Sequence, residues 1–144
     1  GSGQIPLSRH GVDVEAILGA QLVLDRGGAV GIFPEGERGA GDVHLAKGGA
    51  AYLGLRSGAP IVPVALLGTR ARGENKSYVP PKGTRISLSY GDPIRFDAIP
   101  FPRQKSTVDE ATDIVKHALI ETVECALDLT GMSLPGPLGD STHD

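Results

Sequence analysis

The chain has 144 residues, 40% of them hydrophobic, and these values predict one globular domain that is long enough to bury a core. Its single cysteine, Cys125, excludes a disulfide framework and most cysteine-based metal sites. No run of about 18 apolar residues occurs, which excludes a transmembrane helix within this sequence, and the net charge of −3 disfavours nucleic acid as a ligand.

The N-terminal part of the chain is predicted to form a strand, a helix and a second strand. Residues 3–7 resemble a strand whose earlier part is missing from the sequence. Apolar side chains recur at helical spacing over residues 13–26 and predict a helix that Gly27 ends. The continuous apolar run of residues 29–33 predicts a strand buried on both faces. The glycine-rich loop, residues 34–42, follows this strand.

The rest of the chain is predicted to contain two more helices and two more strands. A helix over residues 45–57 ends at Gly58, and residues 61–67 form another strand buried on both faces. Alternating residues 85–90 predict a strand with one solvated face. A long helix begins at a capping box over residues 107–110, continues to about residue 129 and is ended by Gly131.

This order of elements predicts an α/β domain with a mixed, mostly parallel sheet flanked by helices. We assign the domain to residues 3–130 and expect residues 131–144, rich in proline and glycine, to be a disordered tail. Because the sequence opens in what resembles the middle of a strand, we expect the sheet to be incomplete at its N-terminal side.

Charge is distributed unevenly along the chain. Residues 106–144 hold eight acidic side chains and one basic side chain, a net charge of −7, which leaves +4 on residues 1–105. Five cations gather in the basic segment, residues 70–85: Arg70, Arg72, Lys76, Lys82 and Arg85. This segment suits an anionic ligand or a lipid headgroup. The alternative is an ordinary solvated loop.

The stretch GIFPEGERG, residues 31–39, carries the most chemical information. Pro34 ends the predicted strand and Gly36 allows a turn with positive φ, so Glu35 and Arg38 are placed at the carboxyl end of a strand, where open α/β sheets bind ligands. Arg38 offers a planar fork suited to phosphate. The alternative is a surface turn with an exposed Glu–Arg pair.

This stretch resembles the motif Phe-Pro-Glu-Gly-Thr-Arg-Ser of glycerolipid acyltransferases, the family of the lysophosphatidic acid (1-acylglycerol-3-phosphate) acyltransferases. Other blocks agree in order. Residues 3–9 resemble the family block that ends in an arginine, and residues 47–51 resemble its lysine-then-Gly/Ala helix start. Residues 58–66 resemble the last block, Val-Pro-Val-Ala, and residues 91–94 a recurrent Gly-(Glu/Asp)-Pro-Ile segment.

The resemblance implies a fold like that of glycerol-3-phosphate acyltransferases and a role in phospholipid biosynthesis. Such an enzyme moves a fatty acyl group from acyl-CoA or acyl-carrier protein, as co-substrate, to the free hydroxyl of a lysophosphatidate-like acceptor. It implies no metal and no cofactor. It also implies a cytoplasmic protein peripheral to the membrane surface, and it leaves the oligomeric state open.

The resemblance also assigns roles to five residues of an acceptor site. Arg9 and Arg38 correspond to residues that hold phosphate, and Lys47 is a further phosphate contact. Glu35 and Gly36 match the core of the acceptor-binding motif. Glu37 in place of threonine adds a negative charge beside this phosphate clamp, and leaves the identity of the acceptor open.

The catalytic base of the family, a histidine in a His-X4-Asp motif, is absent from these 144 residues. His10 and Glu15 have the same spacing, with glutamate in place of aspartate. They follow the block of residues 3–9 that ends in an arginine, however, whereas the histidine motif of the family precedes that block. We therefore leave the catalytic residues unassigned and expect the chain to be the C-terminal part of an acyltransferase. The alternative is a shortened, inactive homologue that binds phosphate or anionic lipid. A P-loop and a serine-hydrolase elbow are both missing.

Overall fold

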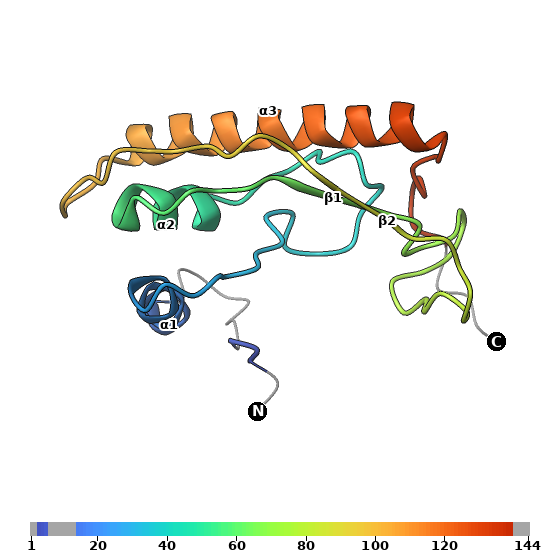
Figure 1. Ribbon diagram of the computed structural model, residues 1–144, viewed down its shortest axis with the longest axis horizontal. Helices are drawn as coiled ribbons and strands as arrows, with labels where there is room; N and C mark the ends of the chain where they lie inside the picture. The colour runs from blue at the N-terminus through green and yellow to red at the C-terminus, as the bar shows by residue number, and fades with distance from the viewer. Residues whose placement is uncertain (1–2, 6–13, 140–144) are drawn as a thin grey trace.

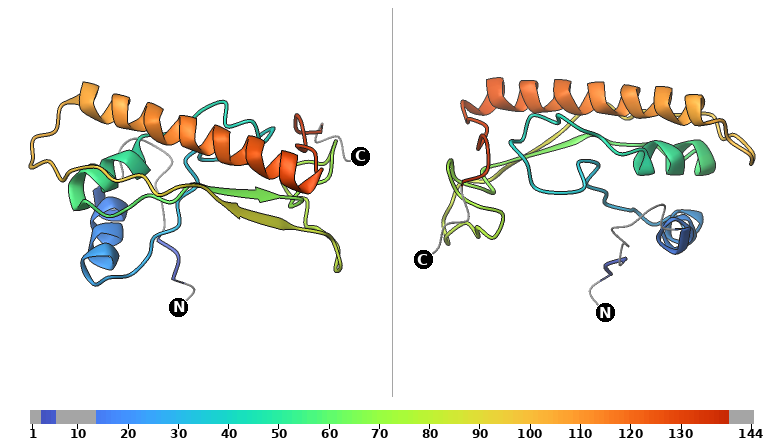
Figure 2. Two further views of the ribbon diagram at one scale, coloured as in Figure 1. Left: turned by 45° about the horizontal axis from the view of Figure 1, so that its top comes forward. Right: turned by 180° about the vertical axis from the view of Figure 1, so that it is seen from behind.

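The computed structural model describes residues 3–5 and 14–139. Its elements, in chain order, are α1 (Val14–Asp25), α2 (Gly49–Ser57), β1 (Val64–Leu67), β2 (Ser87–Tyr90) and α3 (Lys105–Thr130). The long helix α3 runs along one side of the molecule, and α2 and the sheet lie beneath it (Figure 1). Helix α1 contacts α2 on the side away from α3, as the two views of Figure 2 also show. The described residues therefore form a small mixed α/β domain.

The predicted helices are confirmed, and a glycine with positive φ follows each of them as expected: Gly27 after α1, Gly58 after α2 and Gly131 after α3. Gly58 follows α2 with a φ of 68°, and its N–H donates to the carbonyl of Gly54 over 2.8 Å. Gly131 does the same for α3 with a φ of 65°. Glycine is favoured at this left-handed position because it has no Cβ that would clash with the backbone. Helix α2 begins at Gly49, four residues later than predicted.

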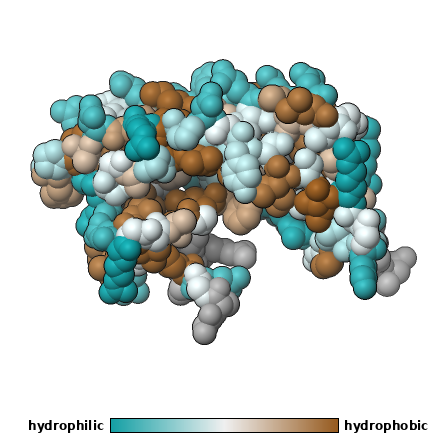
Figure 3. Space-filling view, viewed as in Figure 1, coloured by the Kyte–Doolittle hydropathy of each residue, from teal (hydrophilic) through white to brown (hydrophobic). Residues whose placement is uncertain are grey.

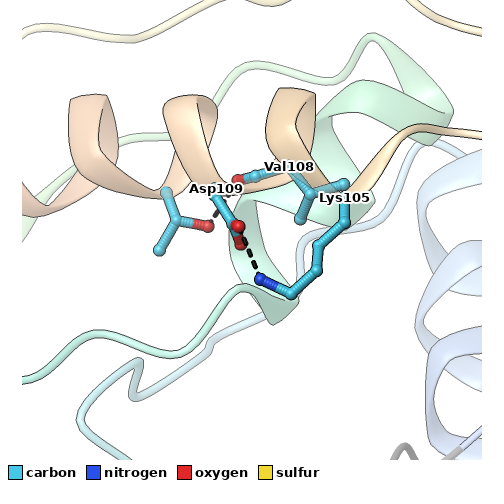
Figure 4. Close-up of polar contacts among 4 residues, drawn as sticks. Lys105, Val108 and Asp109 are labelled. Atoms are coloured by element: carbon cyan, nitrogen blue, oxygen red, sulfur yellow. Dashed lines mark hydrogen bonds and ion pairs between the residues drawn. The ribbon is translucent and has the colours of Figure 1, made fainter.

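The prediction of a capping box over residues 107–110 is wrong. Helix α3 begins at Lys105, and its N-cap, Gln104, makes no side-chain capping bond. Thr107 therefore lies inside the first turn, where it cannot cap the helix. An exposed ion pair one turn apart lies at this end, with Lys105 Nζ 2.6 Å from Asp109 Oδ2 (Figure 4).

The sheet of the described residues has two antiparallel strands, so the predicted mostly parallel sheet is not confirmed. Val64 pairs with Tyr90 and Leu67 with Ser87, and an isolated bridge joins Ile61 to Ile94. The connection between the strands contains no helix, and a chain that returns without a crossover pairs antiparallel.

The strand predicted at residues 29–33 does not form in the structure, and residues 3–5 are not a strand either. Residues 6–7 lie outside the described residues. Phe33 is 84% exposed, so the apolar run has no layer to pack against. A parallel strand is stable only where both of its faces are covered, and here the covering layer is absent from the described part of the chain.

Strand β1 is buried on one face only, which corrects the prediction that residues 61–67 are buried on both. Ala65 and Leu67 face α3 and pack with Ala126, whereas Val64 and Leu66 are exposed on the opposite face. Hydrophobic surface is visible on the side away from α3 in Figure 3. The accessible surface is 10155 Å², where a compact protein of 14.9 kDa has about 7,000 Å².

The core lies between α3 and the layer beneath it, in two clusters. One joins α2 to α3 through Ala51, Leu55, Ala111 and Val115. The other joins the sheet to α3, and Leu134, beyond the helix, packs against it. Residues 131–139 thus contact the domain. The prediction of a tail at residues 131–144 stays a prediction, and residues 140–144 lie outside the described residues.

Candidate functional site

The glycine-rich loop begins with a tight turn that brings it against the chain before α2. The N–H of Gly36 donates to the carbonyl of Phe33 over 3.0 Å, and Gly36 has a φ of 75°. The N–H of Lys47 donates to the carbonyl of Pro34 over 2.7 Å. This long-range bond fixes the two ends of the loop region to each other.

The structure places the side chain of Lys47 directly over Gly36. A Cβ added at Gly36 would lie 2.7 Å from Lys47 Nζ. Gly36 is therefore favoured for its positive φ, while the flexible side chain of Lys47 occupies the space where a Cβ would stand. Two of the residues predicted for the acceptor site, Gly36 and Lys47, are thus in contact.

Glu35 turns away from this pair, toward the far end of the glycine-rich loop. A Cβ added at Gly39 would lie 3.7 Å from Glu35 Oε2. Burial raises the pKa of the Glu35 carboxyl above its ordinary value of 4.5, and the charge of Asp42 raises it further. Both effects disfavour the ionised carboxylate in the folded protein.

We expect Glu35→Gln to stabilise the fold at neutral pH by a few tenths of a kcal/mol. Because the pKa of Glu35 is higher in the folded protein than in the unfolded protein, protonation of Glu35 stabilises the fold. This contribution to the free energy of unfolding is fully present below pH 4.5 and is lost as the pH rises through the folded pKa. The gain should therefore be present at pH 7.5 and disappear at pH 4.0, measured by urea unfolding. Glu110→Gln, at an exposed position on α3, is the control. A gain that is the same at both pH values would contradict the expectation.

Arg38 reaches from the glycine-rich loop into the basic segment. Its Nη1 donates to the carbonyls of Lys76 and Tyr78, over 2.9 and 2.8 Å. The Nζ of Lys76 in turn lies 2.6 Å from Glu37 Oε2. The charge that Glu37 adds to the motif is therefore partly balanced. Both acceptors of Arg38 are neutral carbonyls, so the charge of this exposed guanidinium is still available to an anion.

The remaining sequence-predicted residues contribute less to this picture. Arg9 and His10 lie outside the described residues, and Glu15 lies in the first turn of α1. His44 is exposed beside the glycine-rich loop, where its N–H donates to Asp42 Oδ1 over 3.3 Å. The roles given to Arg9, Glu35, Gly36, Arg38 and Lys47 all stay predictions.

Two features of the site were not predicted. Val43 has a φ of 52° although it is buried and β-branched, a conformation that costs about 1–2 kcal/mol. Arg70 is only 7% exposed and donates to carbonyls in three separate segments. Neither has a signal in the sequence, since Val43 lies in an unremarkable run and Arg70 resembles the exposed cations beside it.

Comparison with protein families supports the reading of this loop. Residues 2–67 match the family model described as acyltransferase. The match spans the glycine-rich loop, Lys47, α2 and β1, so the resemblance drawn from the motifs is confirmed for this part of the chain, and a general acyltransferase function is supported. Neither a curated protein nor a solved structure matches the chain.

Proposed function

We propose that this chain forms the acceptor-holding part of an acyltransferase of phospholipid biosynthesis. The acyl group would move from acyl-CoA or acyl-carrier protein to the free hydroxyl of a lysophosphatidate-like acceptor. The observation that carries the proposal is the acyltransferase match over residues 2–67. These residues include the turn at Gly36 and its two cations, Arg38 and Lys47. The 144 residues contain no His-X4-Asp pair, so acceptor binding, and not proton transfer, is the role given to this chain.

The chemistry of the turn fits a phosphate monoester. Lys47 places an ammonium group over Gly36, where the backbone can approach a ligand closely, and Arg38 lies two residues further on. An ammonium and a guanidinium together can bind phosphate as a point charge and as a fork. We assign Glu35 to a glycerol hydroxyl of the acceptor, because its carboxylate can accept a hydrogen bond from that hydroxyl.

Peripheral membrane association is part of the proposal, because the acceptor is a lipid. The basic segment lies beside the glycine-rich loop through the bonds of Arg38, so its cations and the acceptor site can face one anionic surface. None of the described helices has the length and apolar content needed to cross a bilayer. A cytoplasmic location at the membrane surface is the one we propose.

A second candidate function is binding without catalysis. The missing His-X4-Asp pair favours it, because acyl transfer to a hydroxyl needs a base and the turn offers only cations and Glu35. In this version the chain binds phosphate or an anionic lipid and does no chemistry.

The test combines binding and transfer. We expect the chain to bind lysophosphatidate below its micelle concentration, and Arg38→Ala or Lys47→Ala to weaken binding about tenfold each, since a charge-assisted hydrogen bond is worth about 1.5–3 kcal/mol. Calorimetry at low salt measures the affinity. Lys105→Ala is the matched control, because it removes an exposed cation at the start of α3.

Transfer of radiolabelled oleate from oleoyl-CoA to the same acceptor separates the two candidates. Binding with transfer supports the enzyme, and binding without transfer from either type of thioester donor supports the binding protein. If lysophosphatidate does not bind, or if Lys105→Ala weakens binding as much as Arg38→Ala does, the proposed acceptor site is wrong.

A further inference from the structure

Arg70 is a buried cation at the junction of three segments of the chain. It lies three residues after β1 and is 7% exposed. Its Nη1 donates to the carbonyl of Glu74 over 2.7 Å and to that of Pro137 over 3.4 Å. Its Nη2 donates to the carbonyl of Gly39 over 3.1 Å and, closely, to that of Gly136. One guanidinium therefore joins the glycine-rich loop, the basic segment and the chain after α3.

This set of partners is unusual for a buried charge. A buried arginine is normally paired with a carboxylate, but no carboxylate pairs with Arg70 in residues 3–5 and 14–139. Four carbonyl dipoles replace it. A guanidinium offers these acceptors two separate nitrogens, Nη1 and Nη2, whereas the three donors of a lysine ammonium all belong to one nitrogen.

Two routes lead from Arg70 to Arg38. The first is covalent, since Gly39, whose carbonyl Arg70 holds, is the next residue after Arg38. The second passes through the basic segment. Arg70 holds the carbonyl of Glu74, and two and four residues later the carbonyls of Lys76 and Tyr78 accept the bonds of Arg38. Arg70 thus bonds both to the residue that follows Arg38 and to the segment whose carbonyls accept from the Arg38 guanidinium.

The C-terminal chain adds a third support to this arrangement. The N–H of Gly139 donates to the carbonyl of Glu74 over 3.2 Å, and that carbonyl is also an acceptor of Arg70. A Cβ added at Gly41 would lie 3.2 Å from atoms of Leu134 and Pro135, so the same chain also covers the glycine-rich loop. Residues 134–139 therefore close over the junction from outside.

We propose that Arg70 is a positioning residue for the acceptor site: it holds the glycine-rich loop, the basic segment and residues 134–139 together, and so fixes the guanidinium of Arg38 for binding an anion. Arg70 itself does not touch the ligand, because it is buried. The part that concerns the anion rests on the proposed function, whereas the junction of the three segments does not.

Hydrogen exchange tests the junction without any ligand. In Arg70→Ala, the hydrogen-bonded amides of the three segments, those of Gly36, Glu74, Tyr78 and Gly139, should exchange at least tenfold faster, while those of α2 and α3 keep their protection. Arg70→Lys should release the same three segments, because the four carbonyls are divided between Nη1 and Nη2, and the single, shorter-reaching nitrogen of lysine cannot replace both. Arg72→Ala, which removes an exposed cation of the same segment, is the control and should exchange like the wild type.

A double-mutant cycle tests the effect on Arg38, with glycerol 3-phosphate as the probe. We expect Arg70→Ala to weaken binding about tenfold in the wild type and to have almost no effect in the Arg38→Ala background. A residue that only stabilises the fold would weaken binding in both backgrounds. Lys105→Ala, which removes an exposed cation at the start of α3, is the control and should leave the binding of glycerol 3-phosphate unchanged.

Each result has a separate meaning. If glycerol 3-phosphate does not bind the wild type, the proposed function fails, and hydrogen exchange alone decides whether Arg70 holds the junction. The inference is overturned if the three segments keep their protection in both Arg70 variants. It is also overturned if α2 and α3 lose protection to the same extent, or if the two arginine substitutions act additively.

Discussion

Gly68→Ala is expected to destabilise the protein by about 3–5 kcal/mol, a large part of the total stability of a small domain. Gly68 follows β1 with a φ of 87°. A Cβ added there would lie 2.3 Å from the carbonyl oxygen of Arg85 and 2.9 Å from Met132 Cε. The carbonyl belongs to the backbone that leads into β2, so relief of the clash has to disturb the sheet. Overpacking adds to the cost of the left-handed conformation.

Gly73→Ala separates these two causes. Gly73 has a φ of 81°, nearly that of Gly68, but a Cβ added there would meet no atom within 4 Å. We expect this control to lose only about 1 kcal/mol, the cost of the backbone conformation alone. Thermal and urea unfolding followed by circular dichroism measure both. Equal losses at the two positions would show that Gly68 does not approach the backbone of Arg85 as the structure describes.

Helices and their ends were predicted well because their signals are local. The apolar spacing of α1 and of α3, and the glycines at positions 58 and 131, act within one or two turns of the chain. The alternating pattern of β2 was likewise sufficient, because a solvated face marks each second residue. The start of α3 was missed because a capping box is only one of several ways to begin a helix, and here it is not used.

Strand burial could not be predicted because it depends on elements far away in the chain. A short continuous apolar run indicates a strand buried on both faces only if a second layer covers it. Residues 29–33 and 61–67 have the same pattern, yet the first forms no strand and the second is covered by α3 on one face alone. The pattern describes what the side chains favour, and the covering layer decides the outcome.

The site shows the same division between local and long-range information. The turn at Gly36, with its positive φ, follows from the sequence. The placement of Lys47 over Gly36 depends on a hydrogen bond that spans thirteen residues, from Pro34 to Lys47. In the basic segment, composition alone did not distinguish Arg70, which is buried, from Arg72, which is exposed.

A charge placed on each face of β1 tests how the sheet is covered. Ala65 is 3% exposed and faces α3, whereas its neighbour Leu66 is 45% exposed on the opposite face. Ala65→Asp should destabilise the fold by about 3–5 kcal/mol and leave it largely unfolded, because an unpaired carboxylate would be buried against the helix. Leu66→Asp, one residue away in the same strand, should cost about 1 kcal/mol or less.

Urea unfolding at pH 7.5 compares the two variants, and repeating it at pH 3.5 provides an internal check. Protonation removes the charge, so Ala65→Asp should regain part of its stability at the lower pH relative to the wild type, while Leu66→Asp should change little. If instead both substitutions unfold the chain at pH 7.5, the outer face of the sheet is covered in solution. That result would restore the strand buried on both faces that the apolar run predicts, and it would identify Val64, Leu66, Leu88 and Tyr90 as residues that the covering layer contacts.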